Sequence, residues 1–281
     1  GQWAVLRAAH LARRQGARLR LLHAVEHQGG WALWQQWFGD DVAETGQVDQ
    51  ARQRLEQLGR GVSQQFGIDV ECLTEPGSAL QQILQAQQGG DLVVVGARGH
   101  SAAKDFLLGT TADRLSRKSS VPVLVVRAEP LGDYRKVLVP FDFSPGSEVA
   151  LTRAAELAQQ AALEVLHACQ FGGEGKLKVA GVDDRRIEQH RARYRERARS
   201  EIDLAIRRLK SRPAALSVVL KLGDPTLVCL EHAERVGADL IILGKHGHSL
   251  IEDTLLGSVT RHVLADAACD VMVVPALAYA P

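Results

Sequence analysis

Several features that mark other classes of protein are absent from this sequence. No run of 18 or more apolar residues occurs, and no signal-peptide pattern opens the chain. The net charge is only +1, so no large electrostatic field would attract nucleic acid or a membrane surface. The four cysteines are scattered without C-x-x-C spacing, which argues against a disulfide framework or a zinc site. We therefore expect a soluble cytoplasmic protein with neither a nucleic-acid nor a membrane partner.

What the chain does contain is one glycine pattern written twice. The pattern is Gly, two residues, Gly, nine residues, and Gly followed by a hydroxyl residue; it occurs as Gly96, Gly99, Gly109 and Thr110, and 148 residues later as Gly244, Gly247, Gly257 and Ser258. Each copy follows a short apolar run, DLVVVG or DLIILG. A single set of glycines would mean little, but a duplicated set in matching context predicts two copies of one nucleotide-binding type of module.

Strands alternate with helices in both halves of the chain. In the second half we expect strands at 136–140, 163–168, 216–222, 239–243 and 271–274, and helices at 148–161, 185–210, 226–235 and 258–265. In the first half we expect strands at 18–25, 68–73, 92–95 and 121–126, and helices at 47–65 and 79–87. This alternation predicts an α/β fold with parallel sheets covered by helices on both faces. A linker at 129–134 separates a first module, residues 1–128, from a second module, residues 135–281.

One element of the second module has no counterpart in the first. His23 and His167 occupy equivalent positions, as do Gly77 and Gly223. On this alignment the partner of Asp142 would fall before residue 1. We therefore expect the first module to lack its first strand, and we favour truncation as the reason, because an open flank of a sheet leaves backbone groups unpaired.

The glycine loop of the second module has the chemistry of an anion site. Gly244 ends a strand at the carboxyl edge, where open α/β sheets bind ligands, and glycine lets backbone amides approach a phosphate closely. The helix expected to begin at Ser258 would present unpaired N–H groups and a positive dipole end. Thr260 adds a hydroxyl, and Asp142 can accept hydrogen bonds from a base or a sugar. Alternatively, the glycines only form tight turns and Ser258 only caps the helix.

These motifs resemble the universal stress protein family in its tandem two-domain form. The resemblance rests on the repeated G-x2-G-x9-G-[ST] pattern, on VLVPFD in the second module, and on the last strands VPVLVV and CDVMVV. It implies two Rossmann-like sandwiches of the adenine-nucleotide alpha hydrolase kind that associate through their last strands as a pseudo-dimer, with a homodimer of whole chains as a further option. It also implies ATP or a related adenine nucleotide as the ligand, with Mg²⁺ as a candidate companion.

The resemblance assigns a role to individual residues. Beside the adenine and ribose it places Pro140, Phe141, Asp142 and Ala168; near the ribose and phosphates it places Gly244, Gly247, Gly257, Ser258, Val259 and Thr260. In the first module Gly96, Gly99, Gly109 and Thr110 match the same pattern, but Asp142 has no counterpart there. The second module is therefore the expected main site.

The sequence favours binding over catalysis. No GK[ST] follows the glycines, so a P-loop lysine is missing, and the tighter dinucleotide pattern GxGxxG is also absent. No general base pairs with a nucleophile, so we assign no catalytic or metal-binding residue. We expect a regulatory nucleotide-binding protein of the stress response, with slow ATP hydrolysis at most.

Two alternative functions remain open. Trp31, Trp34 and Trp37, with Phe38, would lie on one side of a helical turn, where they either pack over the sheet or form an interface for a partner or an apolar ligand. In that scaffold, Phe141 and Phe143 would block the nucleotide pocket. An enzyme would instead use His246, His248 and Asp142 for metal-assisted hydrolysis, and its turnover would be lost in His248→Ala.

The arginine-rich segment 185–212 could suggest a nucleic-acid surface. Glutamates such as Glu188, Glu196 and Glu201 are interspersed among its arginines. This mixture favours an exposed helix with local ion pairs over a one-sided basic face.

Overall fold

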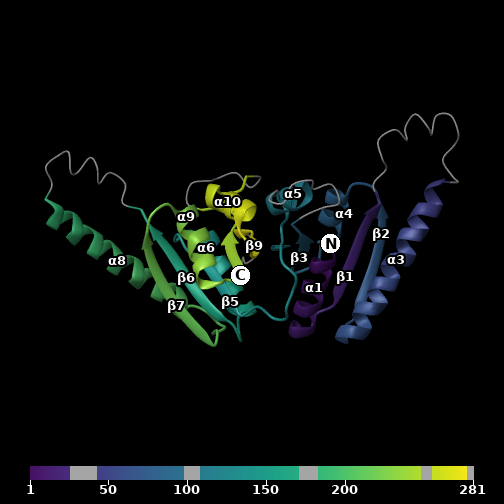
Figure 1. The fold of residues 1–281 in the computed structure, drawn as a ribbon, viewed down its shortest axis with the longest axis horizontal. Helices are drawn as coiled ribbons and strands as arrows, with labels where there is room; N and C mark the ends of the chain where they lie inside the picture. The colour runs from purple at the N-terminus through teal and green to yellow at the C-terminus, as the bar shows by residue number, and fades with distance from the viewer. Residues whose placement is uncertain (26–42, 98–107, 171–182, 248–254, 277–281) are drawn as a thin grey trace.

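A computed structural model describes residues 1–25, 43–97, 108–170, 183–247 and 255–276 (Figure 1). The first module contains α1 (Gln2–Gln15), β1 (Leu19–Val25), α3 (Ala43–Phe66), β2 (Val70–Pro76), α4 (Ala79–Ala86), β3 (Val93–Gly96), α5 (Thr110–Lys118) and β4 (Val123–Val126). The second contains β5 (Lys136–Pro140), α6 (Pro145–Leu157), β6 (Ala162–Cys169), α8 (Asp184–Arg207), β7 (Ala215–Leu222), α9 (Pro225–Val236), β8 (Leu240–Gly244), α10 (Ser258–Asp266) and β9 (Asp270–Val274).

The second module is a parallel sheet with the strand order β9-β8-β5-β6-β7. Its central strand β5 is fully buried at Val137, Leu138 and Val139, as a strand covered by helices on both faces should be. The helices begin where local chemistry favours a start: Ser144 caps α6 by accepting from the backbone N–H of Ser147, and Pro145 occupies the first turn. The predicted α/β class is thereby confirmed.

The two modules share one sheet. β3 and β4 pair in parallel, and β4 then pairs with β9 in the antiparallel sense, with Leu124 opposite Met272. The result is a seven-stranded sheet that crosses from one module to the other. Association through the last strands, which the family resemblance implied, is confirmed by this pairing.

The first module has a break where the second has its central strand. β1 and β2 form a separate two-stranded sheet, and no strand among the described residues lies between β1 and β3. In the second module β5 occupies the corresponding place, paired with β6 on one side and with β8 on the other. The expectation that the first module lacks this strand therefore holds for the described residues.

Two helices of the first module were not predicted, α1 and α5. The fully buried residues of α1 are Ala4, Arg7, Ala9 and Ala12, while its large apolar residues Val5, Leu6 and Leu11 are only partly buried against the core. α5 similarly buries Ala112, Leu115 and Ser116. The start of α6 was also placed too late, because Pro145 and Gly146 belong to its first turn.

The long helix α8 carries local ion pairs along its exposed side. Arg197 Nε lies 2.9 Å from Glu201 Oε1, and Arg199 Nε lies 3.2 Å from Asp203 Oδ1, each pair spaced by one helical turn. These contacts confirm the interpretation of this segment as a solvated helix. Over the part of the chain that the structure describes, no helix is long and apolar enough to cross a membrane.

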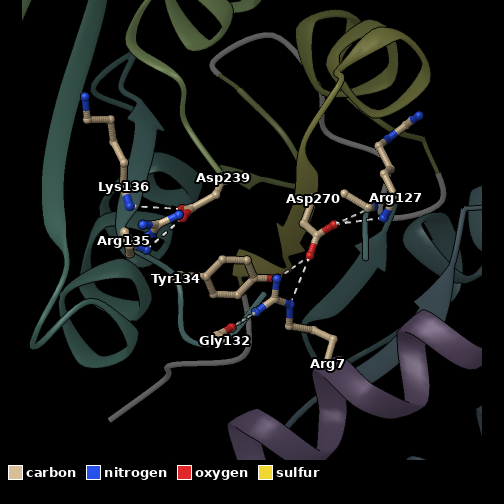
Figure 2. Close-up of polar contacts among 9 residues, drawn as sticks. Arg7, Arg127, Gly132, Tyr134, Arg135, Lys136, Asp239 and Asp270 are labelled. Carbon is tan, nitrogen blue, oxygen red and sulfur yellow. Dashed lines mark hydrogen bonds and ion pairs between the residues drawn. The ribbon is translucent and has the colours of Figure 1, made fainter. Parts of the chain in front are cut away.

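A buried carboxylate, Asp270, holds the two modules together (Figure 2). Asp270 is 1% exposed and accepts hydrogen bonds from Arg7 Nε (3.2 Å), the Tyr134 hydroxyl (2.6 Å) and the Arg127 backbone N–H (2.8 Å). Arg7 also donates to the Gly132 carbonyl and lies over the Tyr134 ring, 4.0 Å from its centroid. Burial, followed by the nearby charge of Asp270, raises the pKa of Tyr134, so its hydroxyl remains a donor.

We predict that Asp270→Asn destabilises the protein by about 3 kcal/mol, because it leaves the buried Arg7 guanidinium without its counter-charge. The measurement is urea unfolding of both proteins under identical conditions. Asp133→Asn is the matched control, since the Asp133 carboxylate is 47% exposed and 3.7 Å from Arg14. The control should shift the free energy of unfolding by less than about 1 kcal/mol. Equal unfolding midpoints for Asp270→Asn and the parent would contradict the prediction.

Candidate functional site

The ends of three neighbouring strands define one edge of the second module. β5 ends at Pro140, β6 at Cys169 and β8 at Gly244. Because these strands are parallel, their carboxyl ends lie at the same edge of the sheet, where open α/β sheets form ligand sites. Of the predicted residues, Pro140 is the last residue of β5, and Ala168 is the residue before the end of β6. Ala168 is partly exposed.

A tight turn after β5 presents an exposed carboxylate, that of Asp142. Its Oδ1 atom accepts hydrogen bonds from the Ser144 backbone N–H (3.1 Å) and from the Ser144 hydroxyl. Phe143 has φ of +66°, the only non-glycine residue with positive φ in the described ranges. Phe141 is buried in the core, and Phe143 packs against Phe141 and the core at 5.4 Å between ring centroids. Both phenylalanine rings are therefore core elements, and the carboxylate is the exposed group of this turn.

The glycine loop and Asp142 meet at this edge. A Cβ atom at position 247 would lie 2.6 Å from Asp142 Oδ2, so a larger residue there would require the exposed carboxylate to shift. At the other end of the loop, the Gly257 N–H donates to the Lys245 carbonyl at 3.0 Å. Gly257 also lies close to Gly247, since a Cβ atom at 257 would be 3.6 Å from the Gly247 nitrogen. The structure thus brings together three predicted residues that are far apart in the sequence.

The helix that follows, α10, begins without a side-chain cap. Gly257 is its N-cap residue, and the first backbone hydrogen bond runs from Arg261 to the Gly257 carbonyl at 2.9 Å. The N–H groups of Ser258, Val259 and Thr260 precede that bond and have no partner within the helix. Ser258 is exposed. This end of the helix has the free donors and the positive dipole that favour an anion.

Two predicted residues have structural contacts that the sequence did not indicate. A Cβ atom at Gly244 would lie 2.5 Å from the carbonyl carbon of Gly146, so this glycine permits β8 to contact the first turn of α6. Thr260 is buried, and its hydroxyl donates to the Gly244 carbonyl at 2.9 Å. Gly146 itself was missed, although the turn Ser144-Pro145-Gly146 directly after a strand was a usable signal.

The buried side chain of His167 contacts the backbone of the turn that contains Asp142. Its Nδ1–H donates to the Phe141 carbonyl at 2.8 Å, and the Tyr194 hydroxyl donates to its Nε2 at 3.0 Å. Because a carbonyl only accepts, Nδ1 carries a proton; in the neutral imidazole Nε2 then accepts from the Tyr194 hydroxyl. Burial lowers the pKa of His167 below its ordinary value of 6.5, which favours that neutral form.

The first module repeats part of this geometry. Gly96 ends β3, Gly109 is the N-cap residue of α5, and Thr110 is its first residue. The Gly109 N–H donates to the Ala97 carbonyl at 2.8 Å, which reproduces the bond between Gly257 and Lys245. No counterpart of Asp142 exists among the described residues of this module, in agreement with the sequence alignment.

Several predicted features lie outside the described residues: Gly99, His100, His248, and the aromatic cluster of Trp31, Trp34, Trp37 and Phe38. His246 lies within the described residues and is partly buried. Its Nε2 atom has no hydrogen-bond partner among these residues. Within the described ranges, no group of three histidine, cysteine, aspartate or glutamate residues could hold a metal ion.

Comparison with known proteins identifies the family. The model of the universal stress protein family matches residues 1–127 and 133–275. The chain belongs to the universal stress protein family. A universal stress protein of Mycolicibacterium smegmatis is 28% identical over 240 residues, which cover 81% of this chain and 78% of that protein. The universal stress protein A homolog 1 of Coxiella burnetii is 32% identical over 148 residues, covering 50% of this chain and 96% of that protein.

A solved structure shows the same fold over nearly the whole chain. A universal stress protein from Archaeoglobus fulgidus matches with a TM-score of 0.66 and covers 98% of this chain and 94% of its own. Sequence identity between the two is 19%, so this likeness supports the fold alone. The predicted family and its tandem form are thus confirmed by the two matched segments and by this full-length neighbour.

The depressed pKa of His167 predicts a pH-dependent stability. Unfolding returns the imidazole to its ordinary pKa of 6.5, so the unfolded chain binds more protons than the folded chain near and below that pH. The stabilisation is complete above about pH 6.5 and is lost as the pH falls from there toward the folded pKa, with a slope of up to about 1.4 kcal/mol per pH unit.

This slope can be measured as urea unfolding between pH 7.5 and 5.5. His167→Gln removes the titrating group while keeping an amide that can donate to the Phe141 carbonyl, so its slope should be shallower than that of the parent. His262→Gln, at an exposed position of α10, controls for the loss of an imidazole elsewhere. A parental slope in His167→Gln would rule out His167 as its source.

Proposed function

We propose that the second module binds ATP or a related adenine nucleotide as a regulatory ligand. One observation carries the proposal: an exposed carboxylate, Asp142, lies beside a glycine loop whose far end is the uncapped N-terminus of α10. A carboxylate accepts hydrogen bonds from a sugar or a base, while free helix N–H groups bind phosphate. The sugar or base of a nucleotide would therefore bind to Asp142, and its phosphates would bind to the N–H groups at the start of α10.

Each residue has a proposed role. The N–H groups of Ser258 and Val259, with the Ser258 hydroxyl, receive the phosphates, and Gly247 leaves room for the ribose beside Asp142. Pro140, Ala168 and the backbone of Phe141 would lie on the adenine side, while the Phe141 ring remains in the core. Thr260 and Gly244 act indirectly. The hydrogen bond from the Thr260 hydroxyl to the Gly244 carbonyl joins the start of α10 to the end of β8, and so it positions the N–H groups that would bind phosphate. Mg²⁺ would accompany the phosphates in solution.

The site suits binding better than chemistry. No general base lies beside a nucleophile among the residues assigned to the site, so hydrolysis would be slow. A ligand that binds only the folded state stabilises it by RT ln(1 + [L]/Kd), which is about 2.7 kcal/mol at a concentration one hundred times Kd. Nucleotide binding can thus change the stability or the partner choice of a stress-response protein. The proposal also includes a cytoplasmic location and module boundaries at residues 1–128 and 135–281.

The first test compares ATP binding by the parent chain and by Gly257→Asp in titration calorimetry. An aspartate at this position can cap α10 itself, and it adds a negative charge where the phosphates would bind. A new Cβ atom there would have neighbours no closer than 3.6 Å, so the variant should fold. We expect its affinity for ATP to fall at least about tenfold, the loss that one charge-assisted contact supplies.

Gly109→Asp is the matched control, because Gly109 is the equivalent N-cap residue of α5 in the first module. We expect this variant to bind ATP at the second module with parental affinity. Two results would refute the proposal: no ATP binding by the folded parent, or unchanged affinity in Gly257→Asp. Binding that is lost in Gly109→Asp instead would move the site to the first module.

A further inference from the structure

The helix α10, whose N-terminus is the proposed phosphate side of the nucleotide site, lacks the charged residues that usually balance a helix dipole. No acidic residue lies in its first turn, and no basic residue lies in its last turn. Its last residue, Asp266, is an exposed acid at the end where the carbonyl groups already carry partial negative charge. The sequence of α10 therefore leaves its C-terminus poorly stabilised.

The equivalent helix of the first module, α5, has the usual charges. Asp113 lies in its first turn, and Arg117 and Lys118 lie in its last turn. Arg117 and Lys118 correspond to Ala265 and Asp266 of α10. A cation that stabilises the C-terminus of α10 therefore has to come from another element of the fold.

That cation is Arg127, which belongs to the first module. Its Nη2 atom donates to the carbonyls of Leu264 and Ala265 in the last turn of α10, to the second of them at 3.1 Å. These carbonyls are among the last four of the helix, for which the helix itself supplies no N–H group. Arg127 is partly buried, so solvent screens this contact less than it would screen an exposed ion pair. A side chain of one module thus caps a helix of the other.

The pairing of β4 with β9 fixes the position of Arg127. Because the two strands are antiparallel, Arg127 follows the end of β4 and lies beside the start of β9, shortly after α10 ends. Its backbone N–H donates to Asp270 Oδ1 at 2.8 Å (Figure 2). The guanidinium is therefore held at the end of α10 by the same contacts that join the modules.

The second module does not return this contact to the first. By the same alignment, Pro275 corresponds to Arg127, and Pro122 corresponds to Asp270. A proline at position 275 has neither a cationic side chain nor a backbone N–H group to donate. The helix that receives a cation from the neighbouring module is therefore the one at the proposed nucleotide site.

A cation at the C-terminus of α10 strengthens anion binding at its N-terminus for two reasons. It offsets the partial negative charge of the terminal carbonyls, which would otherwise oppose the anion along the helix axis. It also holds the last turn in place, so that the N–H groups of Ser258 and Val259 are oriented before the phosphates bind. The helix has nine residues and is about 14 Å long, so the electrostatic effect on affinity is modest, about threefold to fivefold.

We propose that Arg127 is a positioning residue for the phosphates of a nucleotide bound to the second module. The inference rests on the nucleotide site proposed above, and it adds that the first module helps to set the affinity of that site. Linkage makes the effect reciprocal: a ligand that binds more tightly because of the Arg127 contact strengthens that contact by the same factor. Bound ATP therefore stabilises the junction formed by β4, β9 and α10.

The test measures the affinity of the whole chain for ATP and for adenosine by titration calorimetry, with competition where binding is weak. Arg127→Met removes the charge and keeps an unbranched side chain, whereas Arg127→Lys keeps the charge. We expect Arg127→Met to weaken ATP binding about threefold to fivefold and to leave adenosine binding unchanged, because adenosine has no phosphates. Arg127→Lys should retain most of the affinity for ATP. Circular dichroism verifies that each variant is folded under the titration conditions.

Arg135→Met is the matched control. Arg135 is exposed and lies at the start of β5, at the same edge of the second module's sheet, where its backbone N–H bonds to Asp239. The change removes one positive charge from this edge without touching α10, so the affinity for ATP should equal that of the parent. Hydrogen exchange followed by mass spectrometry tests the reciprocal effect: ATP should slow exchange of the amides in 123–128 in the parent, and less so in Arg127→Met.

Four results would overturn the inference and leave the nucleotide site intact. They are equal affinity of the parent and Arg127→Met for ATP, an equal loss of affinity in Arg135→Met, equal losses for ATP and adenosine in Arg127→Met, and exchange in 123–128 that ATP does not slow. Equal losses for the two ligands would indicate a general loosening of the site. A folded parent chain that binds no ATP would instead refute both this inference and the proposed function.

Discussion

Antiparallel backbone pairing between β4 and β9 links the two modules. It joins strands from two modules into one sheet, and it positions Asp270 at the start of β9, where the chain from both modules converges. A carboxylate buried at 1% exposure is costly unless it is fully hydrogen-bonded, and here a guanidinium, a hydroxyl and a backbone amide supply the partners. The interface is therefore specified by a polar cluster as well as by the apolar strands around it.

The helix α10 connects the interface between the modules with the candidate nucleotide site. Arg127, at the end of β4, donates from Nη2 to the carbonyls of Leu264 and Ala265 in the last turn of α10. The first turn of that helix contains N–H groups that have no partner within the helix, and it starts at Gly257, close to Gly247. A cation at the C-terminus of a helix and an anion at its N-terminus both stabilise the helix dipole. The first module thus contacts the helix whose N-terminus is the proposed phosphate side of the second module.

Departures from the sequence-based expectations have a common physical origin. The strands were predictable because buried parallel strands are continuous apolar runs, as in VVV and LII. α1 was harder to recognise, because its fully buried residues are alanines and Arg7, while Val5, Leu6 and Leu11 are only partly buried. Apolar spacing also cannot show that Arg7 pairs with Asp270, because the two residues lie far apart in the chain.

The family, the α/β class, the duplication and the glycine loop could all be inferred from the sequence, because each depends on local spacing and on short apolar runs. The contacts of the individual loop residues became apparent only in the folded chain. Gly244 leaves space for Gly146, the Thr260 hydroxyl bonds to the Gly244 carbonyl, and Asp142 lies beside Gly247. The folded chain also shows that the Asp239 carboxylate accepts hydrogen bonds from the backbone N–H groups of Arg135 and Lys136 at the start of β5. Such contacts join segments that are distant in the chain, and packing sets them, whereas sequence patterns report only which residues are buried locally.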